Sequence, residues 1–204
     1  MKIKNLKIWA LASVAIVALA GCTQDEDYKT AEFTPLVLAE DFLHSADNTP
    51  LVITNWENIA TAGTAKWKQQ IYQGNGYAEF TSYQSGEPSN IGWLVSPAVS
   101  MDAAEGEILR FQVSQSYVSN TVSNKLEVLI SSDYDGTNFA AATWTPLQAN
   151  LPTVDANYFV FQDSGEIDLS GYTGNIHVAF KVTGGTANAI DGSYQIDNVR
   201  IYHN

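Results

Sequence analysis

Apolar and polar residues alternate with a period of two along several short stretches of this 204-residue chain. The clearest stretch is 176–182, where apolar residues occupy every second position and His177 and Lys181, between them, are expected to face water. A period of two is that of side chains in a half-buried β-strand, and no stretch beyond residue 36 shows a convincing helical period. Together with runs of β-branched and aromatic residues, the alternation predicts strands at 36–43, 66–72, 76–82, 91–95, 109–113, 126–130, 157–162, 176–182 and 194–202.

About nine short strands, each with one apolar face, can bury those faces only by packing one sheet on another. We therefore expect an all-β fold, with a single β-sandwich domain over residues 36–204. The sequence shows no internal repeat and no second domain. Because Cys22 is the one cysteine, no disulfide can form within the chain, and a packed core must supply its stability.

The N-terminus has the parts of a bacterial secretion signal. Three lysines precede an apolar run over 8–20, which is shorter than the roughly 20 residues that a membrane-spanning helix needs. The run ends in small residues, and Leu19-Ala20-Gly21-Cys22 matches the lipobox at which a cysteine thiol accepts diacylglycerol. We expect residues 1–21 to be a lipoprotein signal peptide and 22–35 to be a lipidated tether. An ordinary cleaved signal beside an incidental cysteine is the alternative.

The charge of the chain restricts its partners. The signal carries three of the 10 basic residues and no acid, so the mature chain has seven basic and 22 acidic residues, a formal charge of −15. Such a surface repels nucleic acid, anionic lipid and phosphate- or sulfate-bearing ligands, so we expect membrane contact through the lipid alone. Asp25, Glu26 and Asp27 resemble the export signal of Bacteroidetes-type lipoproteins on the outer membrane and predict display at the cell surface, with a solvated spacer as the alternative.

An ordered set of motifs extends over residues 38–202. It comprises Glu40-Asp41-Phe42, the pair Trp56 and Trp67, 92–97 (GWLVSP), 126–136 (LEVLISSDYDG), 167–172 (IDLSGY) and 194–199 (YQIDNV). In this order the motifs resemble a choice-of-anchor J domain, which is related to the cleaved-adhesin domains of bacterial surface proteins. The resemblance implies a jelly-roll sandwich of the galactose-binding or concanavalin type, often calcium-bound, that serves as a non-catalytic module on surface and secreted proteins.

Strand parity places two carboxylates on apolar faces. Glu40 alternates with leucines in the first predicted strand, and Asp197 alternates with Val199 in the last. Two buried carboxylates that met where these strands adjoin would repel each other unless a cation joined them. Because Ca²⁺ takes several oxygen ligands in flexible geometry, we predict a calcium site at Glu40 and Asp197. Further ligands would be Asp41 and Asp191, and the alternative is that both carboxylates lie at the rim of the sandwich, in water or capping backbone N–H groups.

Aromatic residues in polar stretches are candidates for ligand contact. Glycan-binding proteins stack exposed rings on the faces of sugars, since a ring combines a large apolar surface with few flexible bonds. The candidates are Trp144, Tyr117, Tyr83 and Tyr134. Trp93 lies in an apolar strand and is assigned to the core. For each candidate, the alternative is a ring that covers the edge of the core.

The catalytic signatures in the sequence are incomplete. Glu166 and Asp168 are spaced as in the catalytic strand of some jelly-roll glycosidases, but the second carboxylate that retaining hydrolysis needs about 5 Å away has no counterpart at Ser170. The histidines lack the His-Glu-x-x-His spacing of zinc enzymes, and no Gly-x-Ser-x-Gly elbow is present. We therefore expect a non-catalytic binding or adhesion module of a surface lipoprotein, with glycan as its ligand. A structural or protein–protein assembly role is the alternative, and a glycoside hydrolase is a further one.

Lipidation of Cys22 can be tested directly. We expect mass spectrometry of the mature protein to find Cys22 acylated and at the first position, because signal cleavage follows lipidation at a lipobox. Changing Cys22 to Ala should release the protein from the membrane fraction or leave an uncleaved precursor. An unmodified thiol, or cleavage at another residue, would contradict the prediction.

Overall fold

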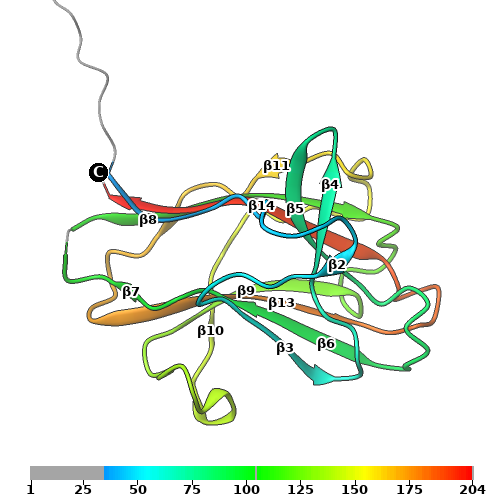
Figure 1. The fold of residues 1–204 in the computed structure, drawn as a ribbon, viewed down its shortest axis with the longest axis horizontal. Coiled ribbons are helices and arrows are strands. Elements are labelled where there is room, and N and C mark those ends of the chain that lie inside the picture. Colours follow the sequence, from blue (N-terminus) through cyan, green and yellow to red (C-terminus); the bar gives the residue numbers. More distant parts are fainter. Residues whose placement is uncertain (1–34, 104, 204) are drawn as a thin grey trace, which may run out of the picture. The chain divides into compact units, whose positions relative to one another are not determined.

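The structure, a computed structural model, describes residues 35–103 and 105–203. In this part of the chain the strands form two antiparallel sheets that stack face to face (Figure 1). The large sheet has eight strands and the small sheet has six. The fold is thus all-β, a jelly-roll β-sandwich, which confirms the fold class predicted from the sequence. Residues 1–34, and with them Cys22 and the acidic head of the tether, lie outside the described residues.

The large sheet runs in the order β11-β8-β14-β5-β4-β2, with β1 also paired to β14 and β12 to β8. β1 and β5 pair with successive parts of β14, so the last strand of the chain lies at the centre of this sheet. The strands are β1 (Leu36–Glu40), β2 (Thr49–Pro50), β4 (Lys68–Tyr72), β5 (Asn75–Thr81), β8 (Glu107–Ser116), β11 (Gln162–Asp163), β12 (Ile167–Asp168) and β14 (Ser193–His203).

The small sheet runs in the order β10-β9-β13-β6-β3, with β7 also paired to β13. Its strands are β3 (Glu57–Ala62), β6 (Asn90–Val95), β7 (Val99–Ser100), β9 (Lys125–Ser131), β10 (Thr145–Pro146) and β13 (Asn175–Gly184). A single turn of 3₁₀ helix, η1 (Phe139–Ala141), lies between β9 and β10. None of the described residues forms a helix that is long and apolar enough to cross a membrane.

The inner faces of the two sheets form the main core. Phe111 of β8 meets Phe180 of β13 edge to face, with ring centroids 5.0 Å apart and planes 79° apart. Both side chains are almost fully buried. Gly92 of β6 lies against the ring of Phe80 so closely that a Cβ atom at this position would overlap it. The core therefore requires a glycine where a strand of one sheet passes a large ring of the other.

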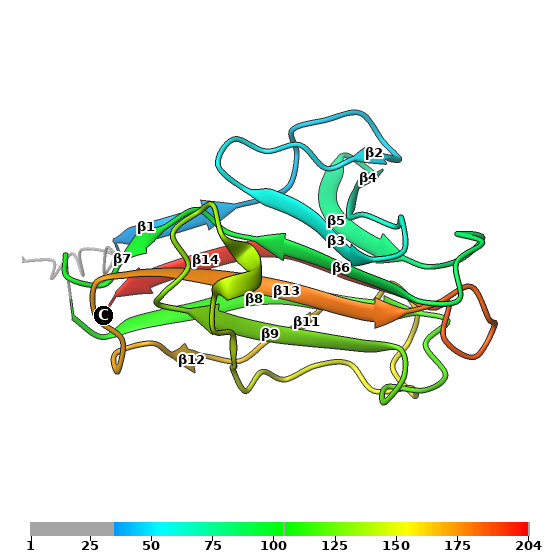
Figure 2. The same cartoon turned by 90° about the horizontal axis from the view of Figure 1, so that it is seen from below.

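A second, smaller core covers the outer face of the small sheet. The loop that contains η1 folds across β9, β13 and β6 (Figure 2) and packs Trp144 against Trp93, with Tyr134 on Trp144. The prediction that His177 faces water is wrong, because this loop buries it. Its Nδ1 lies 2.8 Å from the carbonyl oxygen of Ser96, and its ring contacts Tyr134.

The predicted strands differ from the structure at three places. The stretch 157–162 is a turn that becomes a strand only at Gln162, because Phe159 has a left-handed backbone (φ +59°). Strand β3 has no counterpart in the prediction, since its sequence ENIATA contains one large apolar residue, Ile59. The first strand ends at Glu40, and the left-handed Phe42 (φ +52°) turns the chain away from the sheet.

The contact between Phe111 and Phe180 generates a stability prediction. We expect Phe180→Ala to lower the free energy of unfolding by about 3–5 kcal/mol, because it removes a buried ring and leaves a cavity. Val122 is 84% exposed, so Val122→Ala should change the same quantity by less than about 0.5 kcal/mol. Urea unfolding of the two variants checks this, and equal losses in both would contradict the assignment of the core.

Candidate functional site

The outer face of the large sheet forms a polar floor. In β5, β8 and β14 the core side chains alternate with residues that point away from the small sheet. Strand pairing aligns two sets of these outward residues across the three strands, Thr81–Ser193–Ser116 and Glu79–Gln195–Ser114. Ser116 Oγ and Ser193 Oγ are 2.6 Å apart, and Gln195 Oε1 accepts a hydrogen bond from the Ser114 hydroxyl at 2.7 Å. The floor is therefore a hydrogen-bonded ladder on a rigid sheet.

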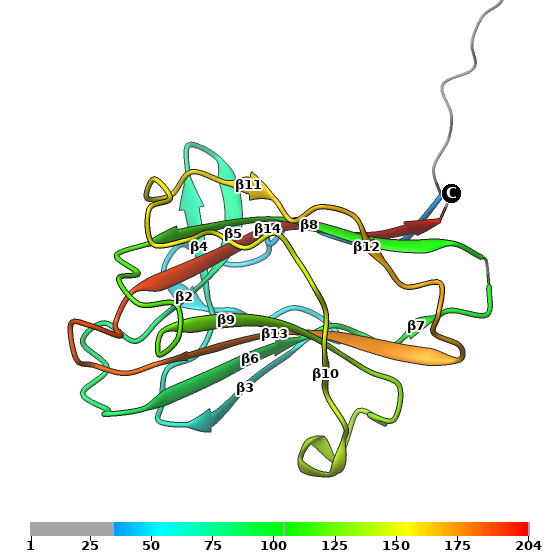
Figure 3. The same ribbon diagram turned by 180° about the vertical axis from the view of Figure 1, so that it is seen from behind.

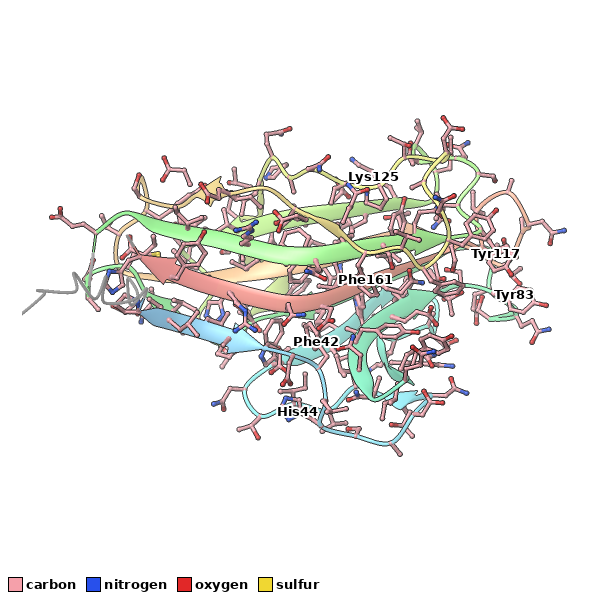
Figure 4. The ribbon with its side chains drawn as sticks, turned by 90° about the horizontal axis from the view of Figure 1, so that it is seen from above. Phe42, His44, Tyr83, Tyr117, Lys125 and Phe161 are labelled. Atoms are coloured by element: carbon pink, nitrogen blue, oxygen red, sulfur yellow. The ribbon has the colours of Figure 1, made fainter. Side chains whose placement is uncertain are left out.

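Aromatic side chains stand around this floor. A hollow of about 770 Å³ lies over it, and its walls include Tyr83, Tyr117, Tyr158 and Phe159. Tyr83 lies two residues after the end of β5 and Tyr117 directly follows β8, and both lie at the same end of the large sheet (Figure 4). Tyr117 is 64% exposed and packs on Tyr158, with ring centroids 4.7 Å apart. The rings thus rest on one another while they keep open faces toward the solvent.

Two of these rings belong to residues with strained backbone. Tyr117 (φ +58°) and Phe159 (φ +59°) are both left-handed, which costs a bulky residue about 1–3 kcal/mol. Gln115 holds both segments in place. Its backbone oxygen accepts the Phe159 N–H at 3.0 Å, its side-chain Nε2 donates to the Ala156 carbonyl at 2.8 Å, and its Oε1 accepts the Val118 N–H at 3.1 Å. Strain that neighbouring bonds maintain in this way is typical of functional loops.

A second hollow of about 390 Å³ shares Phe159 with the first. Tyr72 and Tyr77 from the β4–β5 hairpin line one side, and Phe161 lines the other. The rings of Tyr77 and Phe161 meet edge to face at 5.6 Å. The hairpin and the segment before β11 both rise from the outer face of the large sheet (Figures 1 and 3), and we call the two hollows together the groove.

One carboxylate is held on the floor of the groove. Glu79 Oε2 accepts a hydrogen bond from Gln195 Nε2 at 2.8 Å, and its Oε1 accepts one from Gln70 Nε2 at 3.1 Å. Burial raises the pKa of the neighbouring Tyr77 hydroxyl, and the charges of Glu79 and Asp47 add to this shift. Asp191 lines the same hollow as Glu79. The groove is therefore acidic as well as aromatic.

The structure separates the four aromatic candidates of the sequence into two pairs. Tyr83 and Tyr117 lie in the groove. Trp144 and Tyr134 lie on the opposite side of the sandwich, in the small core beneath η1. Tyr134 is buried, and its hydroxyl donates to Glu57 Oε1 at 2.6 Å. Its pKa is raised by burial first and by the bond to Glu57 second.

Sequence reasoning missed the other walls of the groove. Tyr158 and Phe159 fall in a stretch that resembles a strand, where alternate residues would be expected to pack inwards. The exposed aromatic cluster Tyr158-Phe159 next to Asn157 was the available signal, since asparagine favours turns.

The predicted calcium ligands lie at two separate places. Glu40, Asp41 and His44 each place one ligand atom within 4.8 Å of the others, at the end of β1. The Glu40 carboxylate accepts the Phe42 N–H at 2.6 Å and lies 2.7 Å from His44 Nε2. Asp191 instead lines the groove beyond the start of β14, about 20 Å from Asp197 along an extended strand. The structure therefore does not bring Asp191 to the other three candidates.

The parity argument is wrong at Asp197. The pairing of β14 with β8 shifts between Asp197 and Arg200, and Asn198 is left-handed (φ +49°). Ile196 before this bulge and Val199 after it both face the core, so the alternation is interrupted. Asp197 pairs with the outward-facing Gln112 and lies on the outer face. Glu40 pairs with Val199, whose side chain faces the core, so the side chain of Glu40 also points toward the inner face of the sheet.

Asp197 is nevertheless buried close to the end of β1. Its Oδ2 accepts a hydrogen bond from Asn75 Nδ2 at 2.9 Å, and its Oδ1 accepts the Asn198 N–H at 2.6 Å. Burial raises its pKa, and the nearby charge of Asp41 acts in the same direction. Asp197 is not one of the residues whose ligand atoms lie within 4.8 Å of one another, but it lies close enough to Asp41 to sense its charge. We call Glu40, Asp41 and His44 together with this neighbouring Asp197 the carboxylate cluster. Its carboxylate oxygens suit Ca²⁺, whereas His44 is a nitrogen ligand and does not.

No protein-family model matches the chain, and no curated protein matches it. Among solved structures, the K3 cleaved adhesin domain of Lys-gingipain from Porphyromonas gingivalis is 21% identical over 84% of this chain and all of that domain, with a TM-score of 0.54. The K1 domain of the same protein is 19% identical over 82% of this chain and 98% of its own, with a TM-score of 0.49. A family 11 carbohydrate-binding module from Clostridium thermocellum, in complex with a mixed-linked tetrasaccharide, is 13% identical over 83% and 95%, with a TM-score of 0.48. The likeness to the K3 domain agrees with the jelly-roll fold.

The calcium prediction has a direct thermal test. If the carboxylate cluster binds Ca²⁺ in the folded state alone, a hundredfold excess over Kd should stabilise the protein by about 2.7 kcal/mol. A chelator should then lower the melting temperature, and Asp197→Asn should remove this sensitivity. Asp191→Asn is the matched control and should keep it, because Asp191 lies in the groove. An identical melting curve with and without excess chelator would contradict the site.

Proposed function

We propose that this protein is a cell-surface lipoprotein whose jelly-roll domain is a non-catalytic glycan-binding module, with its ligand in the groove. The observation that carries the proposal is the combination of exposed aromatic rings with a polar, hydrogen-bonded floor on a rigid sheet. A sugar needs both, because its ring presents apolar C–H faces and its hydroxyls need hydrogen-bond partners. Tyr117 and Phe159 would stack on sugar faces, while Ser116, Ser193 and Glu79 would contact hydroxyls.

A polar floor favours glycan over protein as the ligand. A protein-assembly surface would be expected to present a flat, contiguous apolar patch. The first hollow instead places serine hydroxyls and a carboxylate at the centre and rings at the sides. Loops on a rigid scaffold, such as 156–161 and the residues after β8, are also where binding residues are commonly found.

The carboxylates that the sequence offered for catalysis lie elsewhere. Glu166 and Asp168 are exposed on either side of the buried Ile167, at the edge strand β12. The Asp168 carboxylate accepts the Ser170 N–H at 2.8 Å, which gives it a role in the turn, and this bonding to Ser170 lowers its pKa. Neither residue lines the groove.

One observation favours a glycoside hydrolase as the alternative function: two carboxylates, Glu79 and Asp191, line the same hollow. Hydrolysis requires one carboxyl to give a proton to the leaving group. Both oxygens of Glu79 already accept hydrogen bonds from amides, an arrangement that suits a carboxylate acceptor. Polysaccharide turnover by the purified protein, abolished by Glu79→Gln, would favour the hydrolase.

The cellular part of the proposal depends on the N-terminal sequence. A lipid on Cys22 would anchor the protein to the outer membrane, and residues 22–35 would hold the domain away from it. Three acids within five residues of Cys22, at positions 25–27, support display on the outer leaflet. A position on the cell surface would expose the groove to extracellular glycans, the ligands that a glycan-binding module needs to reach.

A glycan array tests the proposed function. We expect the protein to bind particular glycans and Tyr117→Ala to weaken that binding about tenfold, because truncating an aromatic anchor at a binding site typically costs more than about 1 kcal/mol. Stability should change little, since Tyr117 is largely exposed. Trp144→Ala is the matched control, because Trp144 lies on the opposite face. Loss of binding in Trp144→Ala but not in Tyr117→Ala would place the ligand beneath η1 and contradict the groove.

A further inference from the structure

The first hollow of the groove combines negative charge with aromatic rings. Glu79 projects from the floor and Asp191 from the segment before β14. The rings around them are Tyr83, Tyr117, Tyr158 and Phe159. Carboxylates attract a cation, and the faces of aromatic rings do so as well, because the ring quadrupole is negative there. The two kinds of side chain therefore favour the same ligand chemistry.

Glu79 is oriented but not saturated. Gln195 and Gln70 each donate one hydrogen bond to it, one on each oxygen. A carboxylate offers about four lone-pair sites, so about two remain for a ligand. The amides fix the direction of these remaining sites before the ligand arrives, which lowers the cost of binding.

No positively charged side chain lines this hollow in the part of the chain that the structure describes. Lys68 of β4 pairs with Glu79, but its Nζ donates to Asn48 Oδ1 at 3.3 Å, and none of the ion pairs among the described residues joins it to Glu79. The strongly acidic chain adds a long-range field of the same sign. A cationic group would therefore find favourable charge both at a distance and on contact.

We infer that the first hollow recognises the primary ammonium group of an amino sugar, so that the ligand is a glycan with free, unacetylated amines. This inference rests on the proposed function, because it concerns the specificity of the same groove. The ammonium would donate to Glu79 while the adjoining rings cover it, and Asp191, about 13 Å away along the strand that pairs with Glu79, would add negative charge to the hollow. The second hollow, with Tyr72, Tyr77 and Phe161, would stack on the next sugar of the chain. A repeat of apolar faces beside a cation favours a glycan over a basic peptide.

Three hexasaccharides with the same β-1,4 linkage separate charge from shape. Glucosamine, N-acetylglucosamine and glucose hexamers carry an ammonium, an acetamide and a hydroxyl at C2, respectively. With the full chain in detergent, isothermal titration should show the glucosamine hexamer to bind at least about tenfold more tightly than the other two. Raising the salt concentration should reduce this preference. Equal affinity for the glucosamine and glucose hexamers would overturn the inference and leave the groove as the glycan site.

Variants distinguish recognition in the hollow from attraction to the acidic surface. Glu79→Gln should weaken binding of the glucosamine hexamer at least about tenfold more than binding of the glucose hexamer and so remove the preference, whereas Tyr117→Ala should weaken both alike. Glu166→Gln removes the same charge from an exposed position outside the groove and should keep the preference. An equal loss in Glu79→Gln and Glu166→Gln would overturn the inference. Equally tight binding of a lysine hexapeptide, or no binding of any hexasaccharide, would also overturn it.

Discussion

Contact between the inner faces of the two sheets determines where every other side chain can lie. Once Phe111 packs on Phe180 across the sandwich, strand geometry sends alternate residues of β5, β8 and β14 to the outer face. On that face, serines, a glutamine and Glu79 lie in two rows of paired residues that cross three strands. The polar floor is thus a consequence of the core, and its rigidity comes from the same sheet that the core holds in place.

The fold class could be predicted because periodicity records which face of a strand is buried. The alternation in 109–113, 126–130 and 176–182 predicts β8, β9 and β13, the strands that build the core. Local exceptions to that rule could not be predicted. The sequence around Asp197 and Asn198 does not indicate a bulge in β14. The alternation around His177 likewise does not indicate that a loop more than 30 residues away in sequence covers the His177 side chain.

The candidate site could be predicted in part for a related reason. Tyr83 and Tyr117 follow strand ends, where polar context marks them as exposed rings, and the structure brings both to the groove. Glu79, Phe159 and Asp191 come from three distant segments, and only strand order brings them together. The same strand, β14, passes from the groove at Ser193 to the carboxylate cluster at Asp197, about 13 Å along its length. A cation bound at the cluster would therefore stiffen the strand that carries the centre of the floor.

In the proposed function, the ligand binds on the outer face of the large sheet. Hydrogen–deuterium exchange of the full chain, measured by mass spectrometry with and without the tightest-binding glycan, locates the contact without any substitution. Protection should appear in the residues around Tyr83 and Tyr117 and in 156–161, while 133–146 on the opposite face exchanges as before. Protection confined to 133–146, around Tyr134 and Trp144, would contradict the account.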